Sequence, residues 1–100
     1  MDYEYFTTFW LDFDIAERFG YTAINDTAKR AYQEWKSDVK YLTELIMVIN
    51  HKCWDHYRAG NRKLSEYYSN LYYEYYDKAL HYLDNSGKKE DLVYFIQTLD

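Results

Sequence analysis

Four residues whose side chains can bind metals lie within one short segment: His51, Cys53, Asp55 and His56. On a helix His51 and Asp55 share one face while Cys53 and His56 share another, so the two pairs point in different directions. Glu44 extends the first face, but no other segment supplies the Glu-x-x-His pair that a di-iron bundle requires. The pattern therefore predicts no metal, an exposed His51–Asp55 pair, and Cys53 as a small core residue.

Three carboxylates lie near the start of the sequence, at Asp12, Asp14 and Glu17. Asp12 and Asp14 diverge by about 200° on a helix, so they cannot act together as acid and base across one bond. The sequence contains no glycine-rich phosphate loop and no serine nucleophile motif. We therefore predict no enzymatic activity, no catalytic residue and no cofactor. The carboxylates form either a solvated face or a surface that imitates nucleic-acid phosphates.

Tyrosine is the unusual feature of the composition, with 14 copies in 100 residues. The densest group covers most of the circumference of one expected helix, so a small core cannot bury all of it. Tyrosine is common in protein interfaces because it offers a large contact area and a polar hydroxyl. Two interpretations stay open: a docking surface for a partner or a second copy of the chain, or a tyrosine-rich edge of the core. The predicted partner-binding residues are Tyr67, Tyr68, Tyr72, Tyr73, Tyr76, Asp12, Asp14 and Glu17.

Helices are the elements that must carry these side chains, because apolar residues recur at steps of three and four. Adjacent tyrosines such as Tyr67 and Tyr68 argue against strands, which would place neighbours on opposite faces. Proline is absent, and each of the three glycines follows an apolar segment, as glycines do at the ends of helices. The predicted fold class is all-α, a compact bundle of four to five helices in one domain over residues 1–100.

The limits of the helices are predicted from the same pattern. A break at Ser37 and Asp38 is favoured over one continuous helix from Asp26 to Ala59. The segment after this break, rich in Leu, Ile and Val, should be the central and most buried helix. The expected helices are Tyr3 to Phe19 with Phe19 on the apolar face, Asn25 or Asp26 to about Lys36 after a connector over residues 21–25, Val39 to Ala59, Asn61 to about Leu83, and Glu90 to Leu99.

Charge and composition exclude several classes of protein. The net charge is −5 and no cluster of lysine and arginine is present, so direct binding to nucleic acid is not expected. No apolar run is long enough for a membrane span, and the N-terminus lacks the basic and apolar regions of a secretion signal. One cysteine allows no internal disulfide. We therefore expect a cytoplasmic protein that does not associate with membranes.

The first half of the chain also resembles a known group of sequences. The stretches that carry the resemblance are residues 9–20 (FWLDFDIAERFG), 26–27 (DT), 34–36 (EWK) and 41–45 (YLTEL). They are similar to small uncharacterised helical proteins encoded on conjugative transposons and other mobile elements of gut bacteria. The likeness covers about residues 5–57. It implies a bacterial cytoplasmic setting and an accessory role, and it implies no functional residues.

Two functions follow from these observations. The first is a non-enzymatic accessory protein of a mobile element, which binds another protein or itself, as a homodimer, through the tyrosine-rich helical face. The alternative is an acidic inhibitor that imitates nucleic acid and blocks a restriction or CRISPR enzyme of the host, with the first helix as its binding surface.

Overall fold

The computed structural model describes residues 5–100, and over this range the chain forms five α-helices and no strand. The all-α prediction is therefore confirmed. The radius of gyration is 13.1 Å, as expected for a compact chain of this length. Among the described residues no helix is both long and apolar enough to cross a membrane. The helices are α1 (Phe6–Glu17), α2 (Tyr21–Trp35), α3 (Val39–Arg58), α4 (Arg62–Asn85) and α5 (Lys89–Leu99).

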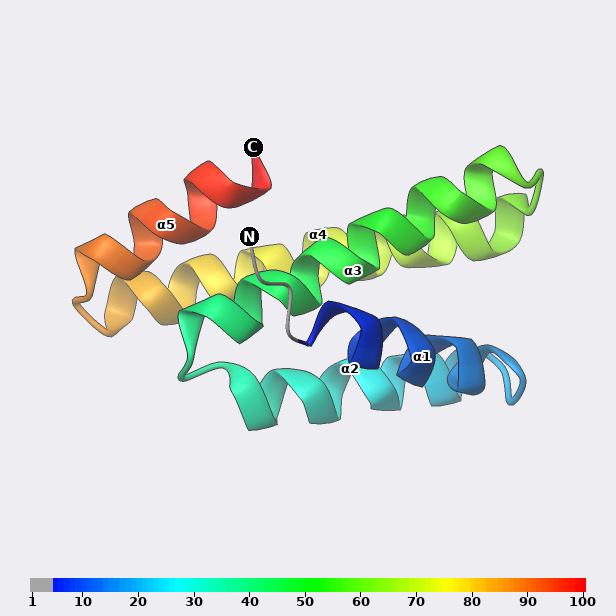
Figure 1. The fold of residues 1–100 in the computed structure, drawn as a ribbon, viewed down its shortest axis with the longest axis horizontal. Coiled ribbons are helices and arrows are strands. Elements are labelled where there is room, and N and C mark those ends of the chain that lie inside the picture. Colours follow the sequence, from blue (N-terminus) through cyan, green and yellow to red (C-terminus); the bar gives the residue numbers. More distant parts are fainter. Residues whose placement is uncertain (1–4) are drawn as a thin grey trace.

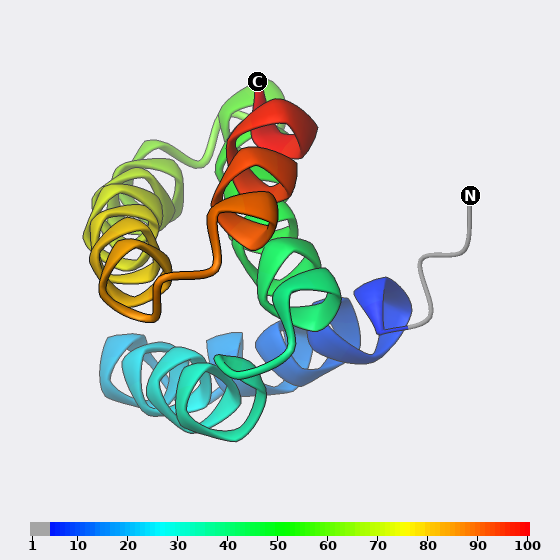
Figure 2. The ribbon, with the colours of Figure 1, turned by 90° about the vertical axis from the view of Figure 1, so that its left-hand side faces the viewer.

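Helix α3 is the centre of the bundle and packs against each of the other four helices. Figure 1 shows α3 and α4 as a long antiparallel hairpin, with the α1–α2 hairpin on one side and α5 on the other. The end-on view of Figure 2 shows the same arrangement. Leu42, Leu45, Ile46, Val48 and Ile49 of α3 are fully buried, which confirms the prediction of a central helix. A single core joins buried residues of all five helices.

Local capping interactions set two of the helix starts that the sequence predicted. The Asp38 carboxylate accepts a hydrogen bond from the Lys40 amide at 3.2 Å, so the favoured break before α3 is confirmed. The Asn61 side chain accepts one from the Leu64 amide at 3.4 Å and starts α4. The C-terminal ends of α2 and α4 and both ends of α5 lie within two residues of the expected ones.

The link between the first two helices is shorter than predicted, because α1 ends at Glu17 and α2 already begins at Tyr21. Gly20 reverses the chain with φ 103°, a conformation that favours glycine, and its carbonyl accepts the first hydrogen bond of α2 from the Ile24 amide at 3.2 Å. The connector predicted over residues 21–25 is therefore wrong. Phe19, expected on the apolar face of the first helix, follows the end of α1 and is 77% exposed. Tyr3, the expected start of the first helix, lies outside the described residues.

Candidate functional site

The tyrosines of α4 point in several directions, and most contact other parts of the protein. Tyr68 is fully buried between α1 and α3, where its ring meets Phe13 edge-on at 5.8 Å. Tyr67 is half-buried; its hydroxyl donates to the Tyr21 carbonyl at 3.0 Å and its ring stacks on Tyr21. Burial raises the pKa of the Tyr67 hydroxyl above its ordinary value. Tyr68 is thus a core residue, and its assignment to a docking surface is wrong.

Two more of the predicted tyrosines support α5. Tyr76 packs against Phe95 of α5 with ring centroids 5.3 Å apart, and Tyr72 packs on Tyr76 at 5.6 Å. Both are half-buried, and burial raises the pKa of each hydroxyl. Tyr73 alone among the five predicted tyrosines of α4 is exposed, at 68%. The predicted tyrosine face is therefore mainly an internal contact between helices, because Tyr67 and Tyr68 face α1, α2 and α3 while Tyr76 packs against α5.

The acidic residues of α1 also separate into two groups. Lys52 of α3 is only 2% exposed, and its ammonium forms ion pairs with Asp14 and, at 3.3 Å, with Glu17. The same ammonium lies 4.2 Å from the centre of the Trp10 ring, close enough for a cation–π interaction. Asp14 and Glu17 thus balance a buried charge of the protein itself, and only Asp12 of the three predicted carboxylates stays exposed and outside this cluster. The prediction of an outward acidic face is therefore wrong for Glu17, whose side chain is 16% exposed, while Asp14 pairs with Lys52 and keeps 44% of its side chain exposed.

Glu17 is the centre of this buried polar cluster. The Tyr68 hydroxyl donates to Glu17 Oε2 at 2.6 Å, and His56 Nε2 lies 3.1 Å from the same oxygen. The His56 and Tyr68 rings stack with an interplanar angle of 5°. Burial, followed by the hydrogen bond to Glu17, raises the pKa of Tyr68 far above its ordinary value, so the hydroxyl stays protonated and donates. The cluster joins α1, α3 and α4 through polar contacts in the interior.

The metal-ligand types predicted on α3 do not come together. His51 is exposed and contacts the Phe6 ring edge-on at 5.5 Å, while Asp55 is exposed without an ion pair to His51. Cys53 is half-buried, with its sulfur 3.7 Å from the Ser65 hydroxyl. Among residues 5–100 no group of three or more His, Cys, Asp or Glu side chains is placed to hold a metal ion.

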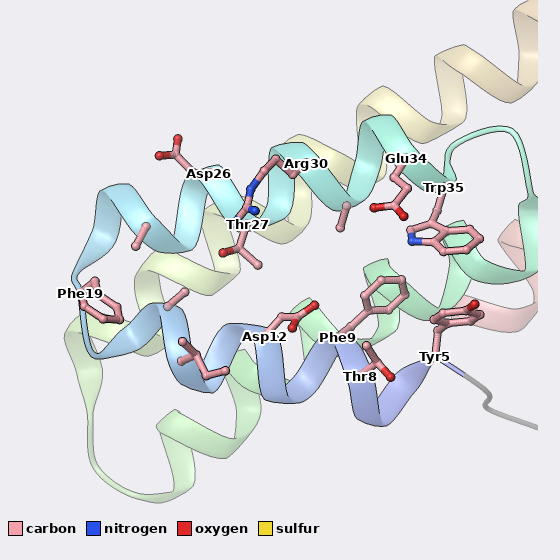
Figure 3. A pocket seen from close by; sticks show the side chains of 14 residues that line it. Tyr5, Thr8, Phe9, Asp12, Phe19, Asp26, Thr27, Arg30, Glu34 and Trp35 are labelled. Carbon is pink, nitrogen blue, oxygen red and sulfur yellow. The ribbon is translucent and has the colours of Figure 1, made fainter.

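The candidate site is a groove of about 490 Å³ between α1 and α2, which we call the α1–α2 groove. Figure 3 shows Tyr5 and Trp35 at one end and Phe19 at the other. The Tyr5 and Trp35 rings are 4.6 Å apart and close their end of the groove. Its lining residues are Tyr5, Thr8, Phe9, Asp12, Ile15, Ala16, Phe19, Ala23, Asp26, Thr27, Arg30, Ala31, Glu34 and Trp35.

Apolar side chains are exposed at the α1 side of this groove. Ile15 is 55% exposed and Phe19 is 77% exposed, and both line the groove. Leu11, one helical turn before Ile15, is also exposed and extends the apolar row along α1. Exposed apolar residues are ordinary when scattered, whereas a continuous row beside a groove is typical of an interaction site.

Carboxylates surround the same groove. Asp12 of α1 and Glu34 of α2 point into the space between the helices, and Asp26 lies at the outer edge (Figure 3). Arg30 is four residues from both Asp26 and Glu34, yet within the described residues no ion pair shorter than 4 Å engages any of these four groups. The groove therefore combines an apolar wall with unpaired charges that are mostly negative.

Sequence reasoning missed two features of this region. Lys52 lies three residues after Ile49 and four before His56, in register with the buried face of α3, and a lysine in such a position indicates a buried anionic partner. The groove itself depends on the short turn at Gly20, which brings α2 alongside α1. The spacing of Leu11, Ile15 and Phe19 by four residues is the one local signal of an exposed apolar row.

Comparisons with protein-family models, curated proteins and solved structures found no match to this chain. The site is therefore interpreted from its own geometry and charge.

Proposed function

We propose that this chain is a non-enzymatic protein-interaction module that binds another protein through the α1–α2 groove. One observation carries the proposal: Ile15 and Phe19 expose most of their apolar side chains at the edge of a groove, next to carboxylates with no ion-pair partner in residues 5–100. Covering these side chains would remove apolar surface from water, which is the main driving force of protein association.

The wider role rests on the resemblance of about residues 5–57 to proteins of bacterial mobile elements. On that basis we propose a cytoplasmic accessory function in such an element, exercised by binding a protein and not nucleic acid directly. The docking surface moves from the tyrosine-rich face of α4 to the α1–α2 groove, because Tyr73 is the only predicted tyrosine that α5 and the core leave exposed.

The alternative function, imitation of nucleic acid by an acidic helix, has less support. Asp14 and Glu17 pair with Lys52, which leaves Asp12 as the only freely exposed carboxylate of the predicted set. Purely charged mimicry would give a complex that dissociates completely at high ionic strength and does not depend on Ile15 or Phe19. A complex that keeps part of its affinity at high salt, through those apolar residues, would exclude mimicry.

Site-specific cross-linking in cells of the bacterium that encodes the chain tests the proposed function. A photoreactive benzoylphenylalanine replaces Ile15 in one variant and Tyr73 in a matched control, since both residues are exposed and lie on different helices. We expect a protein adduct from position 15 and none from position 73. Adducts from position 73 alone would return the docking surface to α4, and adducts from neither position would refute the proposed function.

A further inference from the structure

We infer that the occupant of the α1–α2 groove is a basic amphipathic α-helix of the partner protein. This inference rests on the proposed function and names the chemistry of the partner. Three properties of the groove support it: its length, its apolar lining and its unpaired carboxylates.

The length of the groove fits one short helix. The groove extends along α1 from Tyr5 to Phe19, which at 1.5 Å per residue corresponds to about 20 Å. A helix of about 14 residues has the same length. The Tyr5–Trp35 contact closes one end, and Phe19 lies at the other end beside the turn that joins the two helices (Figure 3). An occupant would therefore lie along the groove, parallel to the two helices.

The lining of the groove offers short side chains and larger apolar contacts that suit the apolar face of a helix. Ala16, Ala23 and Ala31 have short side chains, which let a third helix approach the pair closely. Ile15 near the end of α1 and Phe19, four residues later and just past that end, stand beside them as larger contacts. An amphipathic helix that binds a groove uses apolar anchors at steps of three and four residues, which match this spacing.

The charged side chains around the groove favour a basic occupant over an acidic one. Asp12, Asp26 and Glu34 outnumber Arg30 around the groove, and none of the four is paired within the described residues. Lysine or arginine side chains beside the apolar anchors would reach these carboxylates with their long stems, whereas acidic side chains would be repelled. Charge complementarity thus distinguishes a basic occupant from an acidic one.

The same charges argue against a second copy as the occupant. Each chain carries a net charge of −5, so two copies repel each other. A basic segment of another protein meets the groove without this repulsion.

Three labelled peptides of 14 residues test the inference directly by fluorescence anisotropy. The probe carries leucine and alanine on one helical face and lysine on the other. One control replaces every lysine by glutamate, and a second control shuffles the probe sequence so that no apolar face forms. We expect the probe to bind at least about tenfold more tightly than either control. Equal binding of the lysine and glutamate peptides, or no binding of the probe, would overturn the inference.

Matched variants locate the binding. Ile15→Ser with Phe19→Ser should weaken the probe about tenfold, because two apolar anchors are lost. Asp12→Asn with Glu34→Gln should weaken it about fivefold at low salt, since the replaced charges are exposed. Tyr73→Ser, an equally exposed site on α4, should bind the probe unchanged. Binding that no groove variant weakens would overturn the inference, because the probe would then bind elsewhere.

The outcomes separate this inference from the proposed function. Analysis of the peptide cross-linked to position 15 identifies the partner segment. A basic helical segment supports both the inference and the proposed function. An acidic segment, or a peptide of the chain itself, overturns the inference but leaves the α1–α2 groove as a protein-binding surface. Light scattering gives an independent check: a dimer that Ile15→Ser with Phe19→Ser dissociates would identify a second copy as the occupant and overturn the inference.

Discussion

Helix α1 carries carboxylates on two sides, and the rest of the protein neutralises those on only one of them. Its inner side places Asp14 and Glu17 against Lys52, so that a buried ammonium and two carboxylates balance each other within the bundle. Its outer side leaves Asp12 unpaired beside exposed Ile15. The acidic character of a helix therefore does not define its role. What matters is which carboxylates the rest of the protein neutralises.

The largest effect should come from the inner side. Lys52→Met keeps an unbranched side chain only one heavy atom shorter but leaves Asp14 and Glu17 without their cation, so we expect the free energy of unfolding to fall by about 3 kcal/mol. Urea unfolding followed by circular dichroism measures the loss. Adding Glu17→Gln to Lys52→Met should recover part of the stability, because one unbalanced charge is removed. A matched change at exposed Lys63 should alter the stability by less than about 0.5 kcal/mol, and an equally small effect at Lys52 would contradict the assigned role.

An intermediate effect should appear at alkaline pH. Burial raises the pKa of Tyr75 to about 12 and also raises that of Tyr68, whereas tyrosine in the unfolded chain titrates near 10. Above pH 10 the unfolded state therefore holds fewer protons than the folded state. The contribution of each such tyrosine to the stability is constant below about pH 10 and falls between about pH 10 and 12 by about 1.4 kcal/mol per pH unit.

Urea unfolding at a series of alkaline pH values checks this slope. Tyr75→Phe removes one titrating group and should make the slope shallower, even if the variant is less stable overall. Tyr73→Phe is the control, because Tyr73 is exposed. A slope that is the same in the Tyr75 variant as in the unmodified chain would show that this hydroxyl is accessible to solvent in the folded state.

The smallest effect on stability should come from the outer side. Ile15→Ser with Phe19→Ser changes side chains that are already largely exposed, so thermal unfolding should report a change within about 0.5 kcal/mol. A large loss of stability would mean that these residues support the fold, and the contrast between the two sides of α1 would disappear.

The same contrast holds for α4. Tyr68 and Tyr75 belong to the core, Tyr76 packs against α5 with Tyr72 beside it, and Tyr73 faces solvent. A count of tyrosines predicted correctly that one small core cannot bury every ring. It could not predict which rings α5 covers, because that depends on where a separate helix packs.

Local sequence patterns are enough to define the helices of this protein and most of their limits. Apolar spacing and the caps at Asp38 and Asn61 act over two to four residues, so they do not depend on how the helices pack. Only the tertiary structure decided the roles of Asp14 and Glu17, because Lys52 lies 38 residues from Asp14 along the chain. It likewise decided that Ile15 and Phe19 border a groove. Such pairings depend on how helices distant in sequence pack, which no local pattern encodes.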